Sequence, residues 1–137
     1  MSTKGRYGLI AMVFIAMNQQ EEYIPLNLIA ERQNISQNYL SQIFFLLRGA
    51  NLVKSVRGFQ GGYSLARKAS EIYVGDILRV IEGETNLANI HSHNDIEERI
   101  NIAVWENIDK QINSVLYSIT LEQLASSEGV FFLNSIN

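Results

Sequence analysis

Apolar residues recur with helical spacing through the first third of the chain and predict three helices in quick succession. In residues 3–18 they return every three or four positions behind Ser2 and Thr3, which are candidate N-caps. Pro25 is placed to open a short second helix, and Ser36 to cap a third. The third helix has the predicted inward stripe Leu40, Ile43, Phe44 and Leu47. Two helices joined by so few residues are typical of a helix-turn-helix unit.

Two β-rich stretches, "LVKSVRG" and "GYSLARK", follow the third helix and enclose closely spaced glycines. We expect a hairpin in which Gly58, Gly61 and Gly62 supply positive φ at the tip. The alternative, a phosphate-binding loop, needs a helix after the glycines and an adjoining lysine, but a strand-like stretch follows and the next lysine is Lys68. A helix-turn-helix followed by a basic hairpin predicts a winged helix-turn-helix.

The second half of the chain is predicted to hold a short helix, a loop and a long helix. Residues 73–84 read as an amphipathic helix, residues 85–95 lack periodicity, and apolar residues recur from Ile96 onwards close to a heptad spacing. We expect this seam to pack against a second copy of the chain, while packing on its own winged domain stays open. The predicted dimerisation residues are Ile100, Val104, Trp105, Ile108, Ile112, Val115 and Ile119.

The pattern as a whole predicts a mainly α fold with a small β-hairpin wing (α+β). It divides into a winged helix-turn-helix domain over residues 1–84, a loop over 85–95, and a dimerisation helix with a C-terminal helix and tail over 96–137. Thr120 and Gln123 fit a capping box for that last short helix. The role of the "GVFFL" segment near the end stays open.

The amino-acid composition limits the kinds of functional site that the chain can hold. The 137 residues include no cysteine, which excludes disulfides, thiolate-bound zinc and cysteine-held iron–sulfur clusters. No apolar run is long enough to span a bilayer and no leader precedes a cleavage site, so we expect a cytoplasmic protein. No nucleophile–base set or carboxylate pair points to an enzyme.

Charge is distributed unevenly along the chain. Residues 1–70 hold eight basic and three acidic residues, a net charge of +5, and the remainder holds three basic and eleven acidic residues, a net charge of −8. A basic half predicts a surface for a polyanion, although a merely uneven solvated surface is the alternative. The predicted DNA-binding residues are Lys4, Arg6, Ser36, Gln37, Asn38, Tyr39, Ser41, Gln42, Arg57 and Gly58.

Several motifs in order, "STKGRYGL", "ISQNYLSQIF", "LVKSVRGFQGGYSLAR" and "VGDILRVIEG", resemble the Rrf2 family of bacterial winged-helix transcription regulators. The resemblance implies a homodimer in which each recognition helix and wing meets one half of a near-palindromic operator. It places DNA contacts on the third helix and the wing, with Arg57 in the minor groove. Cluster-binding members usually carry glutamate where this chain has Ser41, so we expect a different operator. Asn51 stands where the family ends this helix with glycine.

The loop at 85–95 departs from the cluster-binding members, which hold iron and sulfur with three cysteines there. We therefore expect no such cluster and no cofactor. A cysteine-free branch, the cysteine-metabolism repressor type, is similar in "KSVRG" and "VIEG" and implies a cysteine-biosynthesis enzyme as a co-regulator. His91 and His93, with Asp95 nearby, are candidate metal ligands, but two imidazoles make an incomplete site and solvated side chains are the other interpretation.

The sequence thus predicts a sequence-specific, homodimeric repressor that binds double-stranded DNA. The alternative is a protein-interaction module of the same fold that acts by binding a metabolic enzyme such as a cysteine synthase.

Overall fold

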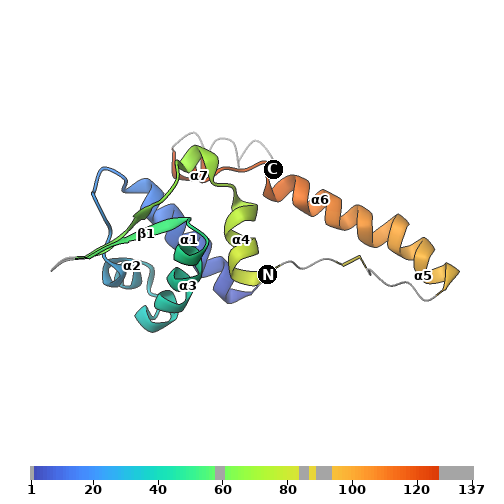
Figure 1. Cartoon of the computed structure of the whole chain (residues 1–137), viewed down its shortest axis with the longest axis horizontal. Helices are drawn as coiled ribbons and strands as arrows, with labels where there is room; N and C mark the ends of the chain where they lie inside the picture. The colour runs from blue at the N-terminus through green and yellow to red at the C-terminus, as the bar shows by residue number, and fades with distance from the viewer. Residues whose placement is uncertain (1, 58–60, 84–86, 89–93, 127–137) are drawn as a thin grey trace.

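The computed structural model describes residues 2–57, 61–83, 87–88 and 94–126. Helices and a hairpin form a body, and a long helical rod projects from it (Figure 1). The elements in chain order are α1 Thr3–Met17, α2 Leu26–Gln33, α3 Gln37–Gly49, β1 Val53–Val56, β2 Gly62–Leu65, the 3₁₀ turn η1 Ala69–Glu71, α4 Val74–Glu82, α5 Asp95–Ile100, the π turn η2 Asn101–Trp105, α6 Glu106–Leu116 and α7 Leu121–Ala125.

Polar side chains begin the helices where the sequence predicts them. The Ser2 hydroxyl accepts a hydrogen bond from the Gly5 N–H at 3.1 Å. The Ser36 hydroxyl accepts one from the Tyr39 N–H at 3.3 Å. At α7, Thr120 and Gln123 form the predicted capping box. Each cap satisfies backbone N–H groups that have no partner within the helix.

Two asparagines in left-handed conformation end the helices of the helix-turn-helix. Asn34 after α2 has φ 54° and Asn51 after α3 has φ 60°. Asparagine tolerates this conformation better than other residues with a side chain. α3 ends at Gly49, and Asn51 takes the left-handed conformation expected of it two residues later, where the chain turns into β1.

The wing is an antiparallel hairpin with a third segment paired to its second strand. Val53 faces Leu65 and Val56 faces Gly62. Ile24, before α2, exchanges two backbone hydrogen bonds of 2.8 Å with Tyr63. A Cβ on Gly62 would lie against the Ile24 carbonyl and 2.7 Å from the Pro25 nitrogen. Gly62 does not have positive φ, so that expectation is wrong for it: close backbone approach requires this glycine.

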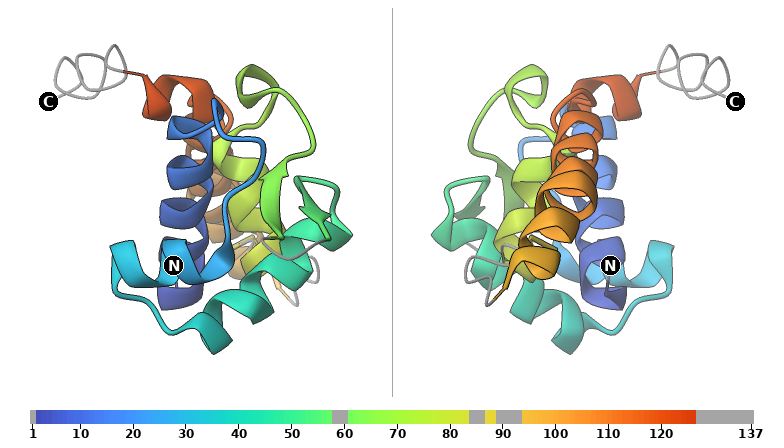
Figure 2. Two further views of the ribbon diagram at one scale, coloured as in Figure 1. Left: turned by 90° about the vertical axis from the view of Figure 1, so that its left-hand side faces the viewer. Right: turned by 90° about the vertical axis from the view of Figure 1, so that its right-hand side faces the viewer.

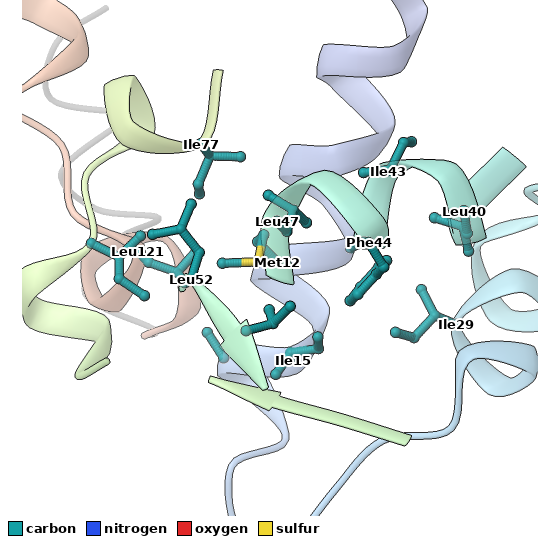
Figure 3. Packing of buried hydrophobic residues seen from close by; sticks show 14 of the residues in the cluster. Met12, Ile15, Ile29, Leu40, Ile43, Phe44, Leu47, Leu52, Ile77 and Leu121 are labelled. Carbon is teal, nitrogen blue, oxygen red and sulfur yellow. The ribbon is translucent and has the colours of Figure 1, made fainter. Parts of the chain in front are cut away.

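The hydrophobic core joins residues from both ends of the described chain (Figure 3). The predicted stripe of α3 is fully buried against Met12 and Ile15 of α1. Leu121 of α7 is also fully buried and its N–H donates to the Ile72 carbonyl at 2.8 Å. The start of α7 is therefore held on the body after the rod.

The rod comprises α5, η2 and α6 in one uninterrupted helical run (Figure 1). Ile96, Ile100, Val104, Ile108 and Ile112 follow one another at intervals of four residues. In an α-helix each such step rotates the side chain by about 40° around the axis, because a turn holds 3.6 residues. The π turn has more residues per turn than an α-helix, so it offsets part of this rotation.

The rod is shorter than predicted at its C-terminal end. α6 ends at Leu116, so Ile119 lies outside it and the prediction of Ile119 as a seam position in this helix is wrong. Ile119 is half-buried, and its carbonyl accepts a hydrogen bond from the Val74 N–H at 3.0 Å. The chain must extend there to pair with the start of α4, and an extended segment cannot continue a helix.

Candidate nucleic-acid interface

The outward face of α3 is polar and exposed. Asn38, Ser41 and Gln42 are exposed on the side opposite the buried stripe, and Gln37 is exposed in the first turn. The Ser41 hydroxyl donates to the Gln37 carbonyl at 3.0 Å, which leaves its lone pairs as acceptors. This face therefore presents amide and hydroxyl groups of the kinds that bind base edges.

Tyr39 has a packing role that the sequence does not reveal. It is half-buried, and its ring meets that of Tyr7 edge to face, with centroids 5.7 Å apart and an interplanar angle of 86°. The contact fixes α3 against α1. Tyr39 and Tyr7 line a hollow with Asn34 and Gln42, so the tyrosine borders the exposed face.

Basic side chains lie on α1 and directly after β1. Lys4 of α1 lines a hollow together with Asn38, Ser41 and Gln42. Arg57 follows β1 directly and is exposed, as is Arg6. The N-terminal end of α1, α2 and α3 gather at one end of the body with the hairpin beside α3 (Figure 2). Of the predicted residues, Gly58 lies outside the described part of the chain.

One carboxylate adjoins the N-terminus of α1. Glu82, at the end of α4, accepts hydrogen bonds from the Ser2 backbone N–H and from the Ser2 hydroxyl, the latter at 2.7 Å. Burial raises the pKa of Glu82 and the two hydrogen bonds from Ser2 lower it, and the pKa as a whole lies below its ordinary value of 4.5. The contact ties α4 to the end of α1 that carries Lys4.

The rod carries a second candidate surface. Its large apolar side chains are exposed by between 37% and 69%. The predicted dimerisation residues among them are Ile100, Val104, Trp105, Ile108, Ile112 and Val115. A contiguous apolar surface on a small protein marks a site of association. Ile119, as described above, does not belong to this stripe.

The loop before the rod is described only in part. His91 and His93 lie outside the described residues. The Asp109 carboxylate of α6 accepts hydrogen bonds from the backbone N–H groups of Leu87 and Ala88, at 2.9 and 2.8 Å. Within the ranges that the structure covers, no three histidine, aspartate or glutamate side chains gather as metal ligands.

No helix in those ranges has the length and apolar character needed to cross a membrane.

The helix-turn-helix, the paired hairpin and the exposed face of α3 define a winged helix-turn-helix protein. Residues 1–127 match the Rrf2 family, whose description is iron-dependent transcriptional regulator. The HTH-type transcriptional regulator CymR of Bacillus subtilis is 42% identical over 125 residues, which are 91% of this chain and 88% of CymR. IscR of Vibrio atlanticus, also an HTH-type transcriptional regulator, is 37% identical over 133 residues, 95% of this chain and 77% of IscR.

A solved structure of CymR, the global cysteine regulator of B. subtilis, superimposes with a TM-score of 0.81 at 41% identity and covers 91% of this chain and 95% of that one. The chain belongs to the Rrf2 family of transcriptional regulators. It is a DNA-binding regulator of the winged-helix class and not an enzyme.

The family description names iron, so the donor set of this chain matters. A cysteine-held iron–sulfur cluster needs thiolates, and the chain has none. The residues present therefore do not fit such a cluster.

Three features near the two surfaces are absent from the sequence-based prediction: Phe45 on α3, the pairing of Ile24 with the wing, and the Asp109 contact. Phe45 has a sequence signal, since it follows Asn38, Ser41 and Gln42 at helical spacing. The other two join groups far apart in the chain, backbone to backbone at Ile24 and side chain to backbone at Asp109, and such long-range contacts have no local sequence signal.

Proposed function

We propose that this chain is a homodimeric repressor that binds a near-palindromic operator through α3 and the wing. The observation that carries the proposal is the exposed polar face of α3, with Lys4 in the hollow beside it and Arg57 exposed directly after the first wing strand. Helix-turn-helix proteins place such a helix in the major groove, where amide side chains pair with base edges. An arginine at a wing is suited to a narrow minor groove, whose potential is strongly negative.

The apolar stripe of the rod supports association of two copies. A stripe on a projecting helix cannot be covered by the body that the structure describes (Figure 1). A second rod crossing the first would bury both stripes and set two copies of α3 against successive turns of DNA.

The signal is proposed to differ from that of cluster-containing relatives. Without cysteine, the chain is proposed to work with no iron–sulfur cluster and no other cofactor. Its similarity to CymR supports a role in cysteine metabolism. On that basis a cysteine-biosynthesis enzyme is the proposed co-regulator, and the cytoplasm is the proposed site of action.

The test is selection of bound fragments from genomic DNA, followed by binding measurements with Arg57→Ala across a salt series. We expect a recovered consensus with two inverted half-sites. Arg57→Ala is expected to weaken binding by roughly 10- to 100-fold, in the range of a lost arginine–DNA contact. Lys110→Ala, an exposed cation on α6, is the matched control and should leave affinity unchanged. Selection that recovers no preferred sequence would contradict the proposal.

A further inference from the structure

The exposed face of α3 carries one large apolar side chain among its polar residues. Phe45 is 67% exposed, although it directly follows Phe44, which is fully buried in the core. Asn38, Ser41, Gln42 and Phe45 stand at positions i, i+3, i+4 and i+7, so they share one face of the helix. The aromatic ring therefore extends the proposed DNA-reading face and does not belong to the core stripe.

The surroundings of Phe45 suit a groove of DNA. Phe45 lines a shallow hollow of about 450 Å³ with Lys4, Asn38, Ser41, Gln42 and Leu46. The hollow is therefore apolar on one side, polar on the other, and bordered by a cation. A protein partner would more often meet an apolar patch with a polar rim, whereas here one apolar side chain continues a line of base-reading groups.

We infer that Phe45 is a specificity-determining residue that contacts the 5-methyl group of a thymine in each operator half-site. This inference rests on the proposed function and adds a base preference to it. The thymine methyl is the apolar group that the major-groove edges of the bases present, and phenylalanine is among the side chains that contact it. Seven residues of helix span about 10 Å. The thymine is therefore expected about three base pairs along the groove from the base that Asn38 faces, given about 3.4 Å per base.

The experiment replaces each thymine of the selected operator in turn by deoxyuridine, which pairs identically but lacks the methyl group. For the wild-type protein we expect one position per half-site at which the replacement weakens binding about fourfold, the effect of one buried methyl-sized group. Phe45→Ala should bind the thymine operator more weakly and be insensitive to deoxyuridine at that position. The two changes should therefore be non-additive.

Two further variants separate this contact from general damage. Phe45→Leu keeps an apolar side chain and should retain part of the deoxyuridine effect. Gln42→Ala, on the same face, should weaken binding and leave the deoxyuridine effect at full size. Because Phe45 is exposed, its replacement should leave the unfolding transition in place, which circular dichroism checks.

The outcomes are distinct. A wild-type protein that binds its operator yet is indifferent to deoxyuridine at every thymine overturns this inference and leaves the proposed function standing. A Phe45→Ala protein with a changed mass by light scattering also overturns it, because the ring then contacts a second copy of the chain. Failure to recover any preferred DNA overturns the proposed function, and this inference with it.

Discussion

Gly62 and Gly49 both adjoin the proposed DNA-binding surface, but their surroundings differ. Gly62 lies where β2 meets the segment before α2, and a Cβ there would press on the Ile24 carbonyl. Gly49, the last residue of α3, has no other atom within 4 Å of the place of a Cβ. A side chain is therefore excluded at the first position and tolerated at the second.

Gly62→Ala is expected to lower the free energy of unfolding by about 1–3 kcal/mol, as overpacking does in a well-packed place. The added methyl group must displace Ile24 and so disturb its two hydrogen bonds with Tyr63. Gly49→Ala is the matched control and should be neutral or stabilising by up to about 1 kcal/mol, because alanine favours the helix. Urea unfolding measures both variants. Equal stability of the two proteins would contradict this explanation of Gly62.

At the scale of elements, the contact between α1 and α4 depends on the charge of one carboxylate. Ser2 caps α1 and also donates to Glu82 at the end of α4. The hydrogen bonds that the Ser2 N–H and hydroxyl donate to Glu82 stabilise its ionised form, and the pKa of Glu82 lies below its ordinary value in the folded protein. The unfolded chain therefore binds a proton at a higher pH than the folded protein does.

This linkage has a definite sign. The stabilisation is present above pH 4.5, the ordinary pKa, and is lost as the pH falls through the lower pKa of the folded state. In urea unfolding from pH 7 to pH 3, the wild type should lose stability more steeply than Glu82→Gln. Glu106→Gln, on α6, is the charge-matched control and should follow the wild type. A constant gap between wild type and Glu82→Gln over this range would contradict the assignment.

The elements themselves were largely predictable, because their signals are local. Ser36 caps α3, Thr120 caps α7 and Asn51 makes the left-handed turn after α3, each through contacts within a few residues of chain. The pairing of Ile24 with Tyr63 and the return of Ile119 to Val74 were not predictable. They join backbone groups far apart in the chain, and the residues involved would suit many other surroundings. The predicted C-terminal end of the rod was wrong because it depends on the long-range pairing of Ile119 with Val74.

The residues of the candidate site were likewise predictable where their signals are local and not predictable where they depend on distant contacts. The polar residues of α3 could be placed on its outward face, because that face is the complement of the buried stripe. Arg57 could be placed after the first wing strand from the glycines that follow it. The burial of Tyr39 against Tyr7 could not be foreseen, since it depends on how α1 crosses α3.

At the scale of the whole molecule, the rod and the body have different tasks in the proposed account. The rod projects from the body (Figure 1). The body carries α3, Lys4 and Arg57, and the rod carries the exposed apolar stripe. The end of α6 is fixed to α4, where the Arg79 guanidinium lies 5.4 Å from the centre of the Tyr117 ring. Pairing of two rods would therefore also fix the distance between two copies of α3.

A negative charge within the stripe should separate the two copies. Ile112→Glu places a carboxylate among apolar groups that are proposed to be buried on pairing, and charge burial without a partner is strongly unfavourable. We expect light scattering to show a dimer for the wild type and a monomer for Ile112→Glu at micromolar concentration. Asn113→Glu adds the same charge at an exposed position about 100° around α6 from Ile112, outside the apolar stripe, and should stay dimeric. Loss of the dimer in both variants, or in neither, would contradict the proposed interface.

The most direct test of the account measures binding to the selected operator before and after about five base pairs, half a helical turn, are inserted between its half-sites. Two copies of α3 held by paired rods can reach both half-sites only when these lie on the same face of the DNA. The account predicts that the half-turn insertion lowers affinity to the level of a single half-site. Insertion of a full turn of about ten base pairs should lower affinity less. Undiminished affinity after the half-turn insertion would contradict it.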